Sequence, residues 1–333
     1  MKEILLTGDR PTGKLHLGHF VGSIKNRIKL QDEVTQAFYM IADVQALTDN
    51  ADNPNKVREN VLEVVLDNLA CGVDPKKTKF FIQSQIPEIA EMTVFFLNLV
   101  TLARLKRNPT VKNEMQQKGY GENVPAGFLS YPVSQAADIL FAQASVVPVG
   151  EDQLPVIEQA NEIVRKFNSI YGEFFKEIKP IISETSRLVG TDGNAKASKS
   201  LGNAIFLSDD DATIEKKVMT MYTDPNHIKV SDPGRVEGNV VFTYLDIFDQ
   251  NKDEVAALKL QYTQGGLGDT TLKKRLAQVL IDLISPIRQR RAELEKDKDA
   301  LIKQLEQSTL EVREIAKHNM QAMRKIMKID YFS

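Results

Sequence analysis

The chain has little cysteine and histidine, no long apolar run and no excess of either charge. A single cysteine, Cys71, cannot form a disulfide within the chain, and no cysteine–histidine cluster has zinc-site spacing, so we expect a small buried residue there. The 333 residues carry 43 basic and 45 acidic side chains, which excludes a global basic field for nucleic acid. RNA contact therefore requires a local patch.

The apolar stretches are too short for a signal peptide or a membrane span. The N-terminal run ends by Gly8, and the longest stretch, from Val94 to Ala103, is interrupted by Asn98 and Thr101. We therefore expect a cytoplasmic protein, and its length leaves room for about two domains.

The first two hundred residues alternate short apolar runs with longer amphipathic ones, which is typical of a parallel α/β sheet. Strands are predicted at residues 4–8, 38–43, 80–83 and 146–150, with a weaker candidate at 187–190. Helices are predicted at 18–30, 54–71, 89–105 and from the fourth strand to about residue 171. Asn53 and Gly72 are expected to cap the second of these helices.

Two changes of texture set the predicted domain boundaries. Residues of about 106–144 interrupt the alternation and are predicted to form an insertion between the two halves of the sheet. Beyond Phe206 the chain is mostly charged helices, with Asp209 to Asp211 expected to cap the first. The prediction is a Rossmann-type α/β domain, residues 1–206, followed by an all-helical C-terminal domain, residues 207–333. Residues 272–327 carry 13 basic against 8 acidic side chains, which fits a solvated helical face or a shallow RNA footprint.

Two of the four histidines, His16 and His19, lie three residues apart after the first predicted strand, where a helix is predicted to begin. Backbone N–H groups at a helix start favour a phosphate, and two imidazoles can add donors. Gly18 has no Cβ, so a flat base could approach its backbone. The glycine spacing fits neither a dinucleotide fingerprint nor a P-loop. A pair of surface histidines is the alternative.

A second candidate is the stretch from Gly190 to Ser200, in which glycines and small polar residues surround Lys196 and Lys199. This composition predicts a mobile loop whose lysines meet a polyphosphate. A loop that closes as the leaving group forms would favour the transition state. A charged surface turn is the alternative.

Acidic residues supply two further candidates. Glu151 and Asp152 follow the fourth strand, where carboxylates can accept hydrogen bonds from ribose hydroxyls or an amino group, although they could equally cap the next helix. Asp138 lies among apolar residues on a predicted helix, where an unpaired carboxylate would be costly. A buried acceptor suits an aromatic N–H or O–H donor, and an internal salt bridge is the alternative.

Both motifs resemble those of the class I aminoacyl-tRNA synthetases. His16-Leu17-Gly18-His19 is similar to H-I-G-H, and Lys196-Ala197-Ser198-Lys199-Ser200 is similar to K-M-S-K-S. The stretches 131–138 and 147–153 further resemble the tryptophanyl-tRNA synthetases. The resemblance implies a homodimer with the insertion at its interface and a helical domain that reads the anticodon. It also implies ATP with Mg²⁺, L-tryptophan and tRNA(Trp) as substrates.

The resemblance implies a role for each matched position. It implies four catalytic side chains, which are His16, His19, Lys196 and Lys199. The other implied ATP contacts are Arg10, Pro11, Thr12, Gly18, Gly150, Glu151, Asp152, Leu188, Ala197, Ser198 and Ser200. The implied amino-acid pocket comprises Gly8, Gln45, Tyr131, Gln135, Asp138 and Gln153, with Asp138 accepting the indole N–H. No metal-ligating residues are predicted.

The chain also departs from the family pattern. Many bacterial members have T-I-G-N in place of the first motif, so this chain is similar to a subgroup with both histidines. Gln45 and Gln135 replace a pocket histidine and methionine and predict a more polar pocket. Ala197 replaces a methionine and predicts looser loop closure. The alternatives are a tyrosyl-tRNA synthetase, a shorter type of nucleotidyltransferase with an H-x-G-H motif, and a non-catalytic paralogue that binds tRNA or tryptophan.

Overall fold

The computed structural model describes residues 3–182, 188–194, 196–199 and 201–332, which form two compact units. The sheet unit comprises Met1–Gly13, Ser23–Ser183 and Asp297–Ser333, and the helical unit comprises Lys14–Gly22 and Glu184–Lys296. In this division by contacts, residues 14–22 and the described residues between 188 and 206 group with the helical unit, and the last helix groups with the sheet. The domain boundary after Phe206 stays a prediction.

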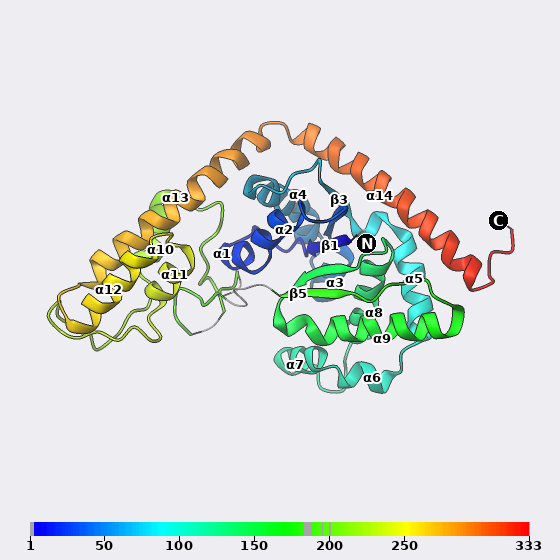
Figure 1. The fold of residues 1–333 in the computed structure, drawn as a ribbon, viewed down its shortest axis with the longest axis horizontal. Helices are drawn as coiled ribbons and strands as arrows, with labels where there is room; N and C mark the ends of the chain where they lie inside the picture. The colour runs from blue at the N-terminus through cyan, green and yellow to red at the C-terminus, as the bar shows by residue number, and fades with distance from the viewer. Residues whose placement is uncertain (1–2, 183–187, 195, 200, 333) are drawn as a thin grey trace. The chain divides into compact units, whose positions relative to one another are not determined.

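The sheet unit contains five parallel strands in the order β3-β2-β1-β4-β5. Figure 1 labels β1, β3 and β5 among the helices of this unit. The strands are β1 (Ile4–Asp9), β2 (Gln36–Ile41), β3 (Thr78–Ile82), β4 (Val146–Val149) and β5 (Lys179–Ile182). The α/β fold class and four strands are confirmed.

The prediction of the fifth strand was wrong. Strand β5 contains a proline and only four residues, so it gives little periodicity, and proline is tolerated at a sheet edge. At the predicted position, Val189 makes an isolated antiparallel bridge to Lys196, and Arg187 lies outside the described residues.

Helices cover both faces of the sheet, because successive strand residues point to opposite sides. Leu6, Phe38 and Phe81 face a core built with α5 (Pro87–Leu97), α8 (Ala126–Leu140), α9 (Leu154–Tyr171) and α14 (Lys298–Ile326). Leu5 faces the other side, where it packs with Leu30 of α2 (Lys25–Leu30). Helix α8 therefore belongs to the core of the sheet unit, although it falls within the predicted insertion.

Local sequence explains most helix ends. Helix α4 (Pro54–Cys71) begins where the Asn53 side chain accepts the Lys56 N–H and ends at Gly72 with a φ of 112°, as predicted. The predicted helix at 89–105 is two helices, α5 and α6 (Leu102–Arg107), because Thr101 caps the second. The predicted helix at 18–30 is likewise divided into α1 (Leu17–His19), the π-helical turn η1 (Phe20–Ile24) and α2. Cys71 is buried as expected.

The remaining elements of the sheet unit are short. They are α3 (Asp43–Asn50), α7 (Pro109–Lys118) and the 3₁₀ turns η2 (Gln83–Gln85) and η3 (Glu151–Gln153).

The helical unit is built on one long helix, α13 (Asp269–Glu295), against which α10 (Asp211–Met219) and α11 (Val240–Phe248) pack. Helix α12 (Lys252–Gln264) packs on α11. Asp210 caps α10 by accepting the Thr213 N–H at 2.7 Å, in agreement with the predicted acidic cap. Across the described ranges, we find no helix with the length and apolar character needed to cross a membrane.

Candidate active site

Asp138 is a buried carboxylate on α8 that two amide side chains bind. It is 1% exposed; Gln83 Nε2 donates to Oδ1 at 2.6 Å and Gln45 Nε2 donates to Oδ2 at 3.3 Å. Within the part of the chain that the structure describes, its partners are these amides rather than a cation, so the salt-bridge alternative fails. Burial raises the pKa of Asp138 to about 7 although both amides lower it. The carboxyl group therefore titrates near neutral pH, and a further N–H donor would stabilise its ionised form.

Gln83 is a functional residue that the sequence analysis missed. It follows β3 directly and is buried, and its Oε1 accepts the backbone N–H of Gln45 at 3.1 Å. The Gln45 amide also donates to Ser134 Oγ at 2.7 Å. The Gln83 side chain thus links the end of β3 to Gln45 of α3 and to Asp138 of α8. A polar residue immediately after a buried apolar strand was the sequence feature that could have identified it.

Arg10, at the end of β1, is held by a carboxylate that the sequence analysis also missed. Asp49 of α3 pairs with Arg10 Nη1 at 2.6 Å and with Lys118 Nζ at 2.8 Å. Burial tends to raise the pKa of Asp49, but Lys118 and Arg10 lower it overall. Nearby, burial and the Glu114 carboxylate raise the pKa of Tyr131 well above its usual range. This corner of the sheet unit therefore gathers charged side chains of both signs.

A third group of predicted residues follows β4. Gly150 lies close to the Asp152 carboxylate, because a Cβ there would lie 2.7 Å from Asp152 Oδ1. The Gln153 amide donates to Asp152 Oδ2 at 3.3 Å. Gln153 is the N-cap of α9 and makes no side-chain capping bond within the described structure, whereas Glu151 and Asp152 lie in the first turn of η3, which leads into α9. Both acids are exposed beyond the strand end.

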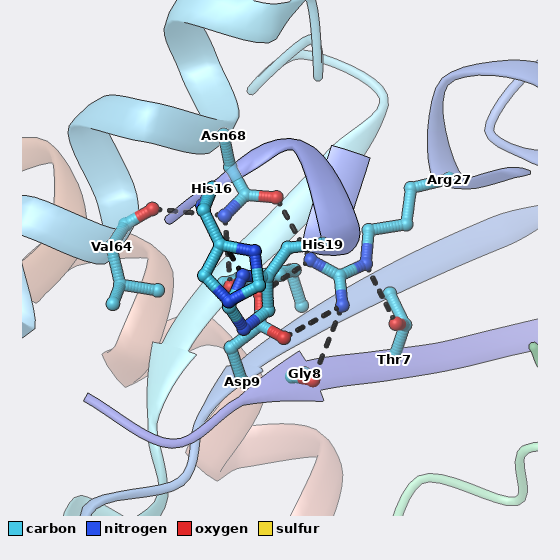
Figure 2. Close-up of polar contacts among 9 residues, drawn as sticks. Thr7, Gly8, Asp9, His16, His19, Arg27, Val64 and Asn68 are labelled. Atoms are coloured by element: carbon cyan, nitrogen blue, oxygen red, sulfur yellow. Dashed lines mark hydrogen bonds and ion pairs between the residues drawn. The ribbon is translucent and has the colours of Figure 1, made fainter. Parts of the chain in front are cut away.

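Beneath the end of β1 lies a buried guanidinium that no motif indicated (Figure 2). Arg27 is 3% exposed and donates to both Asp9 carboxylate oxygens, at 2.6 and 3.0 Å. It also donates to Thr7 Oγ1 and Asn68 Oδ1, each at 2.9 Å. A buried charge needs such complete pairing. These hydrogen bonds hold the carboxyl end of β1 in place, directly before Arg10.

The helical unit holds the histidine motif. His16 is the N-cap of α1, and its Nδ1 accepts the Gly18 N–H at 3.1 Å, while His19 Nδ1 accepts the His16 N–H at 3.2 Å. A neutral imidazole that accepts through Nδ1 carries its proton on Nε2, the atom that can donate to a phosphate oxygen. A Cβ on Gly18 would lie 2.8 Å from His16 Cε1, so the protein itself requires glycine there.

The lysine loop, residues 188–199, lies in the same unit. Where the weaker strand was predicted, Val189 makes an isolated bridge to Lys196, and this bridge and a 2.9 Å hydrogen bond from Ala197 N to Leu188 O join the arms of the loop. Lys196 is exposed, Lys199 is half-buried, and Ser200 lies outside the described residues. Ala197 is only 4% exposed, so its side chain is buried.

The two motifs are tied together through the segment that follows the loop. His16 forms an antiparallel bridge with Phe206, flanked by bonds from Leu17 N to Ile205 O at 3.0 Å and from Leu207 N to Leu15 O at 3.1 Å. The histidine and lysine motifs therefore belong to one compact unit, although about 180 residues separate them.

The predicted site residues divide between the units. The helical unit contributes His16, Gly18, His19, Leu188, Lys196, Ala197, Ser198 and Lys199. The sheet unit contributes Gly8, Arg10, Pro11, Thr12, Gln45, Tyr131, Gln135, Asp138, Gly150, Glu151, Asp152 and Gln153. Their roles toward substrates stay predictions.

A parallel sheet with an H-x-G-H turn and a lysine loop defines a class of proteins, and the comparison with known families agrees. The family model of the class I tRNA synthetases (W and Y) matches residues 2–285. The chain belongs to this family.

Several similar proteins within the family share one name. The tryptophan--tRNA ligase of Clostridium longisporum is 56% identical over 336 residues, which cover 100% of this chain and 98% of that protein. The tryptophan--tRNA ligase of Streptococcus mutans is 54% identical over 338 residues, covering 99% of each chain. The crystal structure of Campylobacter jejuni tryptophanyl-tRNA synthetase complexed with ADP and tryptophan matches with a TM-score of 0.84 at 30% identity, covering 98% of this chain and 99% of that one.

Proposed function

We propose that this chain is a tryptophan--tRNA ligase, which activates L-tryptophan with ATP and transfers it to tRNA(Trp). The observation that carries the substrate class is the buried Asp138 carboxylate, an acceptor for an aromatic N–H or O–H donor. Tryptophan is favoured over tyrosine because the relatives that cover the whole chain at 53–56% identity are named tryptophan--tRNA ligases.

In the first step, a carboxylate oxygen of tryptophan attacks the α-phosphorus of Mg-ATP. An O–P bond forms, the bond from the α-phosphorus to the bridging oxygen breaks, and pyrophosphate leaves with the electron pair. No side-chain nucleophile is needed, so the protein contributes positioning and charge stabilisation. We assign Lys196 and Lys199 to the pyrophosphate, and the Nε2 atoms of His16 and His19 to the phosphate oxygens.

The remaining site residues follow the implied pattern. Arg10, Pro11, Thr12 and Gly18 would contact ATP, as would Gly150, Glu151, Asp152 and Leu188. Tyr131 and Gln153 would contact tryptophan, with Gly8, Gln45 and Gln135 lining its pocket. The support for this assignment is that acidic and amide groups gather at the carboxyl ends of β1 to β4, where parallel sheets bind ligands.

In the second step, a ribose hydroxyl at the 3′ end of the tRNA attacks the carbonyl carbon of tryptophanyl-adenylate. The new ester bond replaces the acyl–phosphate bond, and AMP leaves. We place anticodon contact on the helical C-terminal region, residues 207–333. The basic excess of residues 272–327 is partly used within the chain, since Arg275 pairs with Asp249 and Arg288 with Asp211.

We further propose that the chain acts as a cytoplasmic homodimer, with the insertion at about 106–144 near the interface. Three apolar side chains just before the insertion support an interface there, because Val94, Leu97 and Leu102 are all exposed.

An ATP–pyrophosphate exchange assay with each standard amino acid tests the proposal. We expect exchange to depend on tryptophan. Exchange driven by tyrosine would favour the tyrosyl alternative, and no exchange with any amino acid would favour the non-catalytic paralogue. Aminoacylation of tRNA(Trp) then tests the second step.

A further inference from the structure

Asn203, outside both motifs, binds the lysine loop from two sides. It is 4% exposed; its Oδ1 accepts the Ser198 N–H at 2.8 Å, and its Nδ2 donates to Asp192 Oδ1 at 3.0 Å. Its backbone oxygen also accepts the Thr191 N–H at 2.9 Å. Thr191 and Asp192 precede the two lysines, and Ser198 lies between them. We call this side chain and its two hydrogen bonds the asparagine clasp.

The Asn203 amide packs closely against Gly190. A Cβ on Gly190 would lie 2.1 Å from Asn203 Nδ2, so glycine at that position admits the clasp. A buried amide is stable only when its donor and acceptor are both paired, as they are here. The loop composition predicted free mobility, whereas the clasp and the Val189–Lys196 bridge tie its arms together.

We propose that Asn203 is a positioning residue for adenylate formation, an inference that rests on the proposed function. The clasp holds the backbone between Lys196 and Lys199 through the Ser198 N–H. Both ammonium groups therefore start from one loop conformation when pyrophosphate departs. Pre-ordering the loop removes an entropic cost that would otherwise fall on the transition state. Asn203 acts through the lysines and touches no reacting atom.

The first test is Asn203→Ala, examined by single-turnover adenylate formation and by tryptophan binding. We expect the rate to fall about 10- to 100-fold, as for loss of buried hydrogen bonds, with tryptophan affinity unchanged. Trypsin cleavage after Lys196 and Lys199 should accelerate, because those bonds become accessible when the loop opens. A rate within about threefold of wild type would overturn the proposal.

A matched control is Asn161→Ala in the sheet unit. Asn161 makes an equivalent buried clasp, donating to Ile178 O at 2.9 Å and accepting the Ile178 N–H at 2.7 Å. We expect this variant to lower thermal stability without changing the single-turnover rate or cleavage of the lysine loop. Similar rate losses in both variants would assign the effect of Asn203→Ala to general destabilisation and overturn the proposal.

A charge swap separates positioning from folding. Asn203→Asp alone places two carboxylates together and should be slow because they repel. Adding Asp192→Asn makes position 192 the donor and position 203 the acceptor of the hydrogen bond between them. The single-turnover rate should then return to within about threefold of wild type. A folded double variant that stays slow would overturn the proposal. Failure of tryptophan-dependent exchange by the wild-type chain would overturn the proposed function, whereas equal trypsin cleavage of wild type and Asn203→Ala would overturn the clasp by itself.

Discussion

Replacing Asp138 by asparagine should make the protein more stable at alkaline pH and weaken its binding of tryptophan. In the folded protein burial raises the pKa of this carboxyl group from 3.8 to about 7. The folded state thus keeps a proton that the unfolded chain releases. The folded protein is most stable at a pH below 3.8, the pKa of this group in the unfolded chain, and its stability falls as the pH rises toward about 7. At about 1.4 kcal/mol per pH unit, the cost reaches about 4 kcal/mol at pH 8.

The magnitude for the variant follows from these contacts. Asp138→Asn removes the buried charge but loses one hydrogen bond from an amide, which costs about 1 kcal/mol. The free energy of unfolding should therefore rise by about 3 kcal/mol near pH 8. Near pH 5 the gain should shrink to below about 1 kcal/mol, because the folded wild-type group is then protonated. Urea unfolding at both pH values measures the difference. A variant no more stable than wild type at pH 8 would refute the assigned pKa.

Tryptophan binding gives the second half of the prediction. An indole N–H bonded to an ionised carboxylate is worth about 1.5–3 kcal/mol, so Asp138→Asn should bind tryptophan about 10- to 150-fold more weakly near pH 8. The wild-type affinity should rise with pH through about 7, and the variant should lose this dependence. The chain contains no tryptophan, so indole fluorescence anisotropy reports the ligand alone.

A second buried aspartate supplies the control for this measurement. Asp67→Asn makes the same substitution in α4 of the same unit and should leave the affinity unchanged. If Asp138→Asn binds tryptophan within about threefold of wild type near pH 8, Asp138 is not the indole acceptor.

Three further outcomes are expected. Lys199→Ala should slow adenylate formation about 10²-fold with little change in tryptophan affinity, and a steady-state rate within about threefold of wild type would exclude its role. Arg27→Met should lower the free energy of unfolding in urea by about 3–5 kcal/mol because it removes the cation that pairs with Asp9, and adding Asp9→Asn should recover part of that loss; a loss below about 1 kcal/mol would contradict the buried network. Gly190→Ala should displace the asparagine clasp, slow pyrophosphate exchange and speed trypsin cleavage of the loop. The control Gly22→Ala has open space at its Cβ and should change neither rate. Equal exchange and cleavage rates in the two variants would contradict the close packing at Gly190.

Much of the architecture could be predicted because it depends on local patterns. Apolar runs marked four strands, and Asn53 and Gly72 marked the ends of α4, since capping needs only neighbouring residues. Strand β5 escaped because its hydrogen bonds to β4, rather than any periodicity of its own, make it a strand. Helix α14 was assigned to a separate helical domain, yet Val312 and Met320 complete the core of the sheet unit.

The residues that support the site were harder to find. Gln83, Asp49, Arg27 and Asn203 belong to no motif, and each has a partner 10 to 60 positions away in the chain. Of the four, Gln83 alone had a signal in the sequence, which is its position directly after a buried apolar strand. Side-chain polarity shows that such a residue needs a partner, but the fold decides which one it meets.

The sequence alone thus determined the histidine turn, the lysine loop and the buried Asp138, because each is indicated by the chemistry and spacing of residues close together in the chain. Only the tertiary structure decided what holds them in place. It joined the two motifs through the His16–Phe206 bridge and surrounded Asp138 with two amides. The physical reason is that hydrogen bonds between distant residues depend on the path of the whole chain, whereas caps, turns and strand patterns depend on a few neighbours.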